Sequence, residues 1–197
     1  ARESLDEAGE KAVRADVLRT SFLGASWPGA VKGRDLLPGL SHYLKGNWAW
    51  RWKRGIKSHG WVEYEELYPG IHLTYYGNQG LLEHDFFIAA GADPSRIRLG
   101  LKGQSSARVS ESGDLVMKFG GGTLAYKKPV AYQESETGRV DVEVGYALSP
   151  GADEVSFVLG SYDSSRPLVI DPVLTFSDFL GGSGSDIAAS IAVDKVG

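Results

Sequence analysis

Turn-forming sequences recur along this chain at intervals that suit short strands. Each turn lies between runs rich in Val, Leu, Ile, Tyr and Phe, and no amphipathic helical period fills the intervals. The turns are Gly-Asn-Gln-Gly (77–80), Gly-Ala-Asp-Pro-Ser (91–95), Glu-Ser-Gly-Asp (111–114), Gly-Gly-Gly-Thr (120–123), Ser-Glu-Thr-Gly (135–138), Ser-Pro-Gly-Ala-Asp (149–153) and Asp-Ser-Ser-Arg-Pro (163–167). This spacing is typical of an all-β protein, and we predict an antiparallel β-sandwich or an open barrel.

The predicted strands account for most of the chain after residue 40. We expect them at 41–45, 61–65, 71–76, 81–88, 96–102, 106–110, 114–119, 123–133, 139–148, 154–162 and 167–174. The Pro- and Gly-rich stretch from Trp27 to Gly39 is predicted to be a loop. Because 42% of the residues are hydrophobic and 11% are aromatic, the chain has enough apolar side chains for a core.

Composition argues against several classes of function. The net charge of −4 disfavours nucleic-acid binding, and only Arg-Trp-Lys-Arg-Gly-Ile-Lys (51–57) is locally basic. Cysteine is absent, which excludes disulfides, thiolate zinc sites and thiol nucleophiles. No apolar run approaches the roughly 20 residues of a membrane helix, and Gly-Gly-Gly at 120–122 lacks the Lys-Ser/Thr of a phosphate loop. We therefore expect no nucleic-acid partner, no membrane span and no cofactor.

Three stretches resemble large exported bacterial proteins that carry SBBP-type β-propeller repeats. They are YEELYPGIHLTYYGNQGLLEHDFFIAAGADPSRIRLGLKG (64–103), SESGDLVMKFGGGTLAYKKPVAYQ (110–133) and YDSSRPLVIDPVLTFSDFLGGSGSDIAASIAVD (162–194). In such proteins a β-rich domain of poorly known function precedes the propeller, in an extracellular or cell-surface setting. The resemblance implies a β-rich domain over 13–174 and a fragment of a first propeller repeat over 175–197, after a charged, flexible leader at 1–12.

A propeller strand without the rest of its blade cannot pair its backbone groups. We therefore expect residues 175–197 to be disordered, to pack back on the main domain, or to pair with a neighbouring chain in a homodimer. Gly-Gly-Ser-Gly-Ser-Asp-Ile-Ala-Ala at 181–189 matches much of a calcium-binding nonapeptide, but Ala188 replaces the large apolar residue and the repeat occurs once. The propeller resemblance explains this stretch better, so we predict no metal site.

The segment 71–88 reads as a hairpin with three chemically active side chains on one face. A two-residue loop at Asn78-Gln79 or at Gly77-Asn78 places His72, Tyr76, Glu83 and Asp85 on the same face, opposite a core face that includes His84 and Phe86. Two carboxylates at i and i+2 of a strand lie about 6.6 Å apart along the backbone, which is near the separation used by inverting glycosidases. The candidate catalytic residues are therefore Glu83 and Asp85 as acid and base, assisted by His72. A metal site and a merely solvated sheet face remain alternatives.

Trp48, Trp50 and Trp52 alternate in Asn-Trp-Ala-Trp-Arg-Trp-Lys-Arg-Gly (47–55). On an extended backbone the three rings would project to one side, where they could stack on sugar rings together with Tyr76. The alternative is that these large rings fill the core or close an open barrel end.

These features support two functional hypotheses. The first is an extracellular, non-catalytic β-rich module that precedes a propeller and binds carbohydrate or surface partners. The second is a hydrolase that acts on glycosidic bonds through the Glu/Asp pair.

Overall fold

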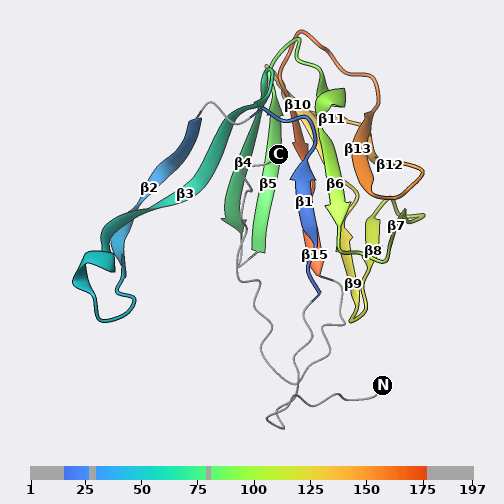
Figure 1. Cartoon of the computed structure of the whole chain (residues 1–197). Helices are drawn as coiled ribbons and strands as arrows, with labels where there is room; N and C mark the ends of the chain where they lie inside the picture. Colours follow the sequence, from blue (N-terminus) through green and yellow to red (C-terminus); the bar gives the residue numbers. More distant parts are fainter. Residues whose placement is uncertain (1–15, 27–29, 79–80, 177–197) are drawn as a thin grey trace.

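The computed structural model describes residues 16–26, 30–78 and 81–176, and this part of the chain is all-β (Figure 1). The predicted fold class is therefore confirmed. The strands of the largest sheet are β2 (Ala30–Tyr43), β3 (Lys53–Tyr68), β4 (Ile71–Asn78), β5 (Leu81–Ile88), β10 (Val130–Ser135), β11 (Gly138–Val142) and β14 (Leu168–Asp171). A second sheet contains β1 (Arg19–Phe22), β6 (Arg98–Lys102), β12 (Val144–Leu148) and β13 (Glu154–Leu159). A third contains β7 (Ser106–Val109), β8 (Leu115–Lys118), β9 (Thr123–Tyr126) and β15 (Leu174–Phe176).

The order of strands brings distant parts of the chain together. The seven-stranded sheet runs β11-β10-β14-β5-β4-β3-β2, so β14 lies between β10 and β5. The two four-stranded sheets run β1-β6-β13-β12 and β15-β9-β8-β7. The strand pairs are antiparallel, and none of the three sheets closes on itself. Two short 3-10 helices, η1 (Ala49–Arg51) and η2 (Pro94–Arg96), occur in the connections.

The core lies between the inner face of the seven-stranded sheet and the smaller sheets. Ile71, Leu73, Phe86 and Ile88 point inward from β4 and β5 and are at most 1% exposed. The ring centroid of Phe86 lies 6.1 Å from that of Phe22 on β1 and 5.9 Å from that of Phe157 on β13. The sheets therefore pack face to face as a sandwich with open edges. Each fully buried large apolar side chain contributes roughly 1.5–3 kcal/mol to the stability of the fold.

The hairpin 71–88 forms with a register that differs from both predicted ones. Asn78 pairs with Leu81 and Tyr76 pairs with Glu83, so the pairing leaves Gln79 and Gly80, which lie outside the described residues, between the strands. The predicted faces are nevertheless confirmed. A two-residue loop can move along the chain by one or two residues, and the same side chains still lie on the same face of the hairpin.

Residues 53–60, which were not predicted to be a strand, begin β3, and the predicted strand 167–174 is divided into β14 and β15 at Pro172. Three further segments differ from the predicted strands. Residues 30–39 were predicted to be a loop, but they begin β2. This strand lies at the edge of its sheet, where Pro38 is tolerated although it has no backbone N–H to donate. The predicted strand 123–133 is divided into β9 and β10 at Pro129, and the strand 139–148 is divided into β11 and β12 at Glu143. At both divisions the chain passes from one sheet to another, and sequence periodicity carries no signal for such a change.

Strands β2 and β3 extend beyond the sandwich as a two-stranded ribbon (Figure 1). The pairing of β3 with β4 reaches Trp61, opposite Tyr76, so the residues before Trp61 pair only with β2. We call residues 36–60 the arm. Between residues 31 and 55, all side chains except those of Ser41 and Trp52 are exposed.

The predicted domain boundary at residue 175 falls within β15. Its Thr175 and Phe176 pair with Ala125 and Leu124 of β9, which continues the third sheet. The predicted leader at 1–12, the calcium-like nonapeptide and the segment from 177 onward lie outside the described residues. Among the helices of the described part, none is long and apolar enough to cross a membrane.

Candidate functional site

The outer face of the seven-stranded sheet carries a group of carboxylates near its centre. Alternation along β5 turns Glu83 and Asp85 to this face while His84 and Phe86 turn inward. The pairing of Ile170 with Phe86 makes Asp171 the next cross-strand neighbour of Asp85. Two rows of side chains therefore run across the strands, next to each other on this face. One row is Trp61, Tyr76 and Glu83, and the other is Thr74, Asp85 and Asp171.

Asp85 and Asp171 form a pair of carboxyl groups within hydrogen-bonding reach of each other. The hydroxyl of Tyr76 donates to Asp85 Oδ1 at 3.1 Å. Oδ1 of Asp171 is buried and, within the described part of the chain, has no hydrogen-bond partner. A proton on Asp85 would supply a donor to Asp171, so the two groups can share one proton.

The electrostatics of the pair favour this shared proton. Burial, followed by the negative charge of Asp171, raises the pKa of Asp85 to about 6. Burial and then the charge of Glu83 also raise the pKa of Asp171. Two neighbouring carboxylates repel each other when both are ionised, so the last proton leaves this pair at a higher pH than it leaves an isolated aspartic acid. The pKa of Tyr76 is raised by burial and by Asp85, which keeps its hydroxyl a donor.

Glu83 is held apart from this pair by a different partner. Its side chain is only 8% exposed, and the amide Nδ2 of Asn78 donates to both carboxylate oxygens at 3.2 and 3.1 Å. The predicted pair of Glu83 and Asp85 therefore lies on one face, as expected, but Glu83 has little surface to offer a substrate.

Aromatic side chains surround the carboxylates. Trp61, opposite Tyr76, is 41% exposed, and Phe87 on β5 is 43% exposed. The guanidinium of Arg139 lies 3.7 Å from the ring centroid of Tyr132 on β10, two strands from Asp85. This face combines hydrogen-bond acceptors with exposed ring faces.

His72 shares the face but not the carboxylate contacts. It pairs with Phe87, and the two ring centroids are 6.2 Å apart. Its Nδ1 accepts from the backbone N–H of Glu66 at 3.4 Å, and its Nε2 is 3.6 Å from Glu66 Oε1. The structure therefore places His72 with Glu66 and Phe87, whereas one of the two predicted registers placed it opposite Glu83.

The tryptophans at the end of the arm do not form the predicted strip. Residues Ala49–Arg51 form η1, so Trp48 and Trp52 flank a helical turn instead of alternating on a strand. The prediction of an extended backbone was wrong at this point. The alternative of core filling is also wrong for Trp48 and Trp50, which are 64% and 77% exposed.

Asp171 is the residue of the site that the sequence analysis missed. It lies in Pro-Leu-Val-Ile-Asp-Pro (167–172), where the resemblance indicated only a join between domains. The alternation of Val169 and Asp171 with buried Leu168 and Ile170 marks it as outward-facing. No local pattern reveals that β14 inserts between β10 and β5, which is what brings Asp171 to Asp85.

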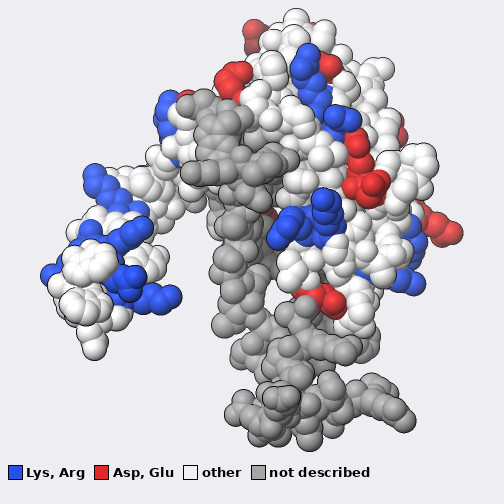
Figure 2. All heavy atoms as spheres, in the orientation of Figure 1, with Lys and Arg blue, Asp and Glu red and all other residues white. Residues whose placement is uncertain are grey.

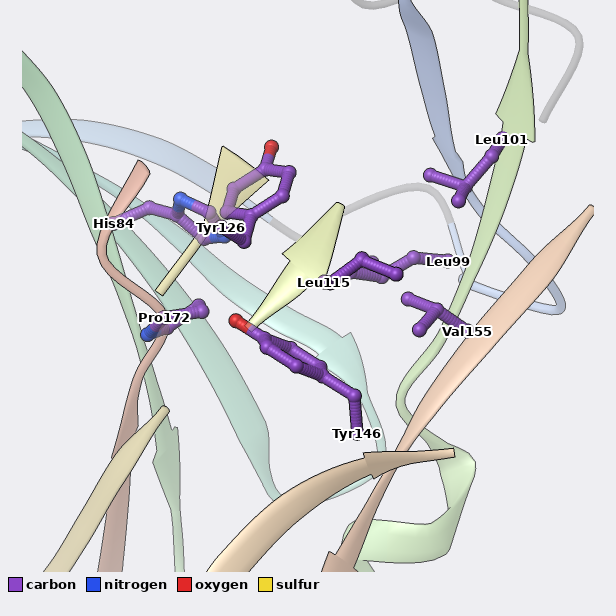
Figure 3. A pocket seen from close by; sticks show the side chains of 8 residues that line it. All are labelled: His84, Leu99, Leu101, Leu115, Tyr126, Tyr146, Val155 and Pro172. Atoms are coloured by element: carbon purple, nitrogen blue, oxygen red, sulfur yellow. The ribbon is translucent and has the colours of Figure 1, made fainter. Parts of the chain in front are cut away.

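A small cavity lies in the interior, where the three sheets meet. Figure 3 shows its lining, to which His84 contributes from β5, Leu115 from β8, Tyr126 from β9 and Tyr146 from β12. Its volume of about 10 Å³ leaves room for roughly one water at most. Burial lowers the pKa of His84 to about 4, so this side chain is a neutral core residue, as predicted, and the cavity is a packing defect.

Comparisons with known proteins identify a family without a known role. A family model described as a domain of unknown function (DUF7948) matches residues 1–173. No curated protein and no solved structure matches the chain. Within the described residues, no group of three or more His, Asp and Glu side chains is arranged to hold a metal ion.

Proposed function

The chain belongs to the DUF7948 family of domains of unknown function, and we propose that it is a non-catalytic β-sandwich module that binds carbohydrate on the outer face of its seven-stranded sheet. The observation that supports this proposal most strongly is the position of the Asp85–Asp171 pair beside the Trp61–Tyr76 pair. Carboxylate oxygens accept hydrogen bonds from sugar hydroxyls, and such charge-assisted bonds are among the stronger ones. Exposed rings offer a flat apolar surface to the C–H face of a pyranose.

The carboxylates have a geometry that suits binding better than glycoside hydrolysis. Glycosidases hold their two carboxyl groups about 5–5.5 Å or 6.5–9.5 Å apart, so that a sugar carbon or a water fits between them. Asp85 and Asp171 are direct cross-strand neighbours on β5 and β14, so this pair has no sugar-sized gap built between its two strands. Glu83 is buried and bound by Asn78.

A hydrolase remains the second candidate, and one specific observation favours it. The pKa of Asp85, raised to about 6, suits a general acid at near-neutral pH. In that case Asp85 would donate the proton to the glycosidic oxygen, and Asp171 would orient the carboxyl group of Asp85. The sequence suggested a different acid–base pair, Glu83 and Asp85.

We also propose an exported setting next to a β-propeller. The three stretches that resemble SBBP-repeat proteins support this setting, since they span residues 64–103, 110–133 and 162–194. Secretion of the full-length protein into the medium or onto the cell surface, measured by protease accessibility of intact cells, tests the location.

Glycan-array binding tests the carbohydrate proposal. We expect the 197-residue chain to bind, and we expect Trp61→Ala and Asp85→Ala to weaken binding about fivefold or more, because each removes a ring or an acceptor worth roughly 1 kcal/mol or more. Val158→Ala, on the exposed side of β13, serves as the control and should bind normally. Loss of binding with Trp50→Ala and not with Trp61→Ala would place the glycan on the arm instead.

The same preparation distinguishes binding from turnover. A panel of chromogenic glycosides should stay intact with the wild-type protein. Release of product that is abolished by Asp85→Asn, with folding unchanged, would replace the binding proposal with the hydrolase.

A further inference from the structure

The arm presents apolar side chains to solvent over most of its length. Exposed large apolar residues include Leu36, Leu40, Tyr43, Leu44, Trp48 and Trp50, on strand β2 and in the connection between β2 and β3. Monomeric soluble proteins rarely expose contiguous apolar surface of this kind unless it binds something. A two-stranded ribbon is also marginally stable in water, so a partner that covers the arm would stabilise it.

The arm is cationic, whereas the rest of the chain is acidic. Residues 36–60 contain five Lys and Arg (Lys45, Arg51, Lys53, Arg54 and Lys57) and no Asp or Glu. The other residues contain 16 Lys and Arg against 25 Asp and Glu, a net charge of −9. On the side of the molecule shown in Figure 2, the far end of the arm is covered by basic and uncharged residues, well away from the acidic side chains of the sandwich.

The turn at the end of the arm holds rings and cations together. The guanidinium of Arg51 lies 5.2 Å from the ring centroid of Trp50, and that of Arg54 lies 4.9 Å from the ring centroid of Trp52. Trp52 Nε1 donates to the carbonyl oxygen of Gly46 at 2.9 Å, which closes the turn. Any surface that accepts the tryptophans therefore also meets the positive charges.

The β2 edge of the arm is unsuited to strand addition. Pro38 lacks a backbone donor, and the pairing of β2 with β3 shifts between Leu36 and Leu40 and again between Ser41 and Tyr43. Irregularities and proline on an edge strand prevent another strand from continuing the sheet. A partner that meets β2 must therefore be bound by side chains, which disfavours a second copy joined along that edge.

We propose that the arm docks the domain onto an anionic lipid surface. The tryptophan and tyrosine rings would lie at the level of the headgroups, where amphipathic rings are favoured, and Leu44 would enter the acyl boundary. Lys and Arg would contact the headgroup phosphates, and each such cation strengthens binding about fivefold, equivalent to roughly 1 kcal/mol. The length of the arm keeps the acidic sandwich away from the negative surface. This proposal is independent of the carbohydrate site.

Co-sedimentation of the full 197-residue chain with vesicles tests the proposal. We expect binding to vesicles of phosphatidylcholine with phosphatidylglycerol and little binding to phosphatidylcholine alone. High salt should weaken the binding, and the tryptophan emission should shift to the blue when vesicles are added.

Variants of exposed arm residues separate the two contributions without disturbing the core. The triple change Arg51→Gln, Lys53→Gln and Arg54→Gln should reduce binding on the order of a hundredfold, from three cations at about fivefold each. Trp50→Ala should reduce it about tenfold or more through lost apolar contact. The matched controls are Lys118→Gln and Val158→Ala, which are exposed on the sandwich and should bind as the wild type does.

Three results would overturn the proposal. They are the absence of binding to either kind of vesicle, equal binding to both kinds, and unchanged binding by the arm variants. A concentration-dependent dimer that the arm variants abolish, measured by analytical ultracentrifugation in the absence of vesicle binding, would assign the arm to a second copy of the chain. Tight binding of a single-stranded oligonucleotide in preference to the vesicles would assign it to nucleic acid.

Discussion

Asp171 of β14 stands beside Asp85 of β5, and neither strand supplies a positive charge to separate the two carboxyl groups. The hydroxyl of Tyr76 donates to Asp85 at 3.1 Å, and burial and Glu83 raise the pKa of Asp171 more than the positive charge of Arg139 on β11 lowers it. Uncompensated like charges on neighbouring strands lower stability. The retention of such a pair on an accessible sheet face is more easily explained by ligand binding than by folding.

The first prediction is that Asp85→Asn stabilises the protein at pH 7. The pKa of Asp85 is raised from its ordinary value of 3.8 to about 6, so the stability contributed by this group is full below pH 3.8 and is lost as the pH rises through 6. An amide keeps an acceptor for Tyr76 and a donor for Asp171 without a charge. We expect a gain of roughly 1–3 kcal/mol in the free energy of unfolding at pH 7, and little change at pH 4.

Urea denaturation at both pH values measures this gain. Glu136→Gln, on the exposed turn between β10 and β11, is the control and should leave stability unchanged. A destabilised Asp85→Asn protein at pH 7 would show that Asp85 is charged and favourably solvated, and the shared proton would then be wrong.

The sequence predicted the face of Asp85 but not its partner. Alternation within 71–88 sorted inward from outward side chains correctly, because a two-residue loop preserves that sorting wherever it is centred. Pairing between β5 and β14 joins residues 80 to 84 positions apart, and no local pattern encodes it. The same reason explains why 123–133 and 139–148 each read as one strand although they cross between sheets.

The arm shows a different kind of failure. Pro38 and Gly39 made 27–39 look like a loop, since neither fits a central strand. β2 is an edge strand, where the same residues are tolerated at an irregularity of the ladder. Alternating tryptophans likewise suggested a strand, whereas they flank the short turn of η1.

The second prediction concerns Gln133, a buried polar residue on the inner face of β10. Its Nε2 donates to the carbonyl oxygen of Asp163 at 2.8 Å, and its Oε1 accepts from the backbone N–H of Asp163 at 2.9 Å. Gln133→Met keeps the volume but removes these hydrogen bonds, and only the carbonyl oxygen of Asp163 keeps another partner, the backbone N–H of Arg166. We expect a loss of about 1–3 kcal/mol in the free energy of unfolding, with faster amide exchange at Asp163 as the local signature. Glu134→Ala, exposed on the same strand, should cost little, and an equal loss in both variants would contradict the role of Gln133.

The third prediction compares two glycines in the left-handed region. Gly103 has φ +108°, and a Cβ there would clash with the carbonyl oxygen of Val17. Gly138 has φ +116°, and no atom lies within 4 Å of its added Cβ. Both alanine variants carry backbone strain of about 1 kcal/mol or more, but only Gly103→Ala adds the clash. Thermal unfolding should therefore show a clearly lower midpoint for Gly103→Ala than for Gly138→Ala, and equal midpoints would mean that the segment near Val17 can move away.

The fourth prediction follows from the opposite titrations of two consecutive residues. The pKa of His84 is lowered by burial from 6.5 to about 4, so its stability contribution is full above pH 6.5 and is lost as the pH falls towards 4. Asp85 has the opposite effect: its contribution to stability is lost as the pH rises from 3.8 to about 6. The two effects, each of roughly 3 kcal/mol at most, therefore largely cancel in the wild-type protein.

We expect a nearly flat stability between pH 4 and 6.5 for the wild type. Asp85→Asn should lose stability as the pH falls through this range, because the titration of His84 is then no longer offset by that of Asp85. His84→Phe should lose stability as the pH rises, because only the aspartate remains. Unfolding free energies of the three proteins at several pH values provide the measurement, and parallel pH profiles for the two variants would show that these buried groups do not control the acid response of the fold.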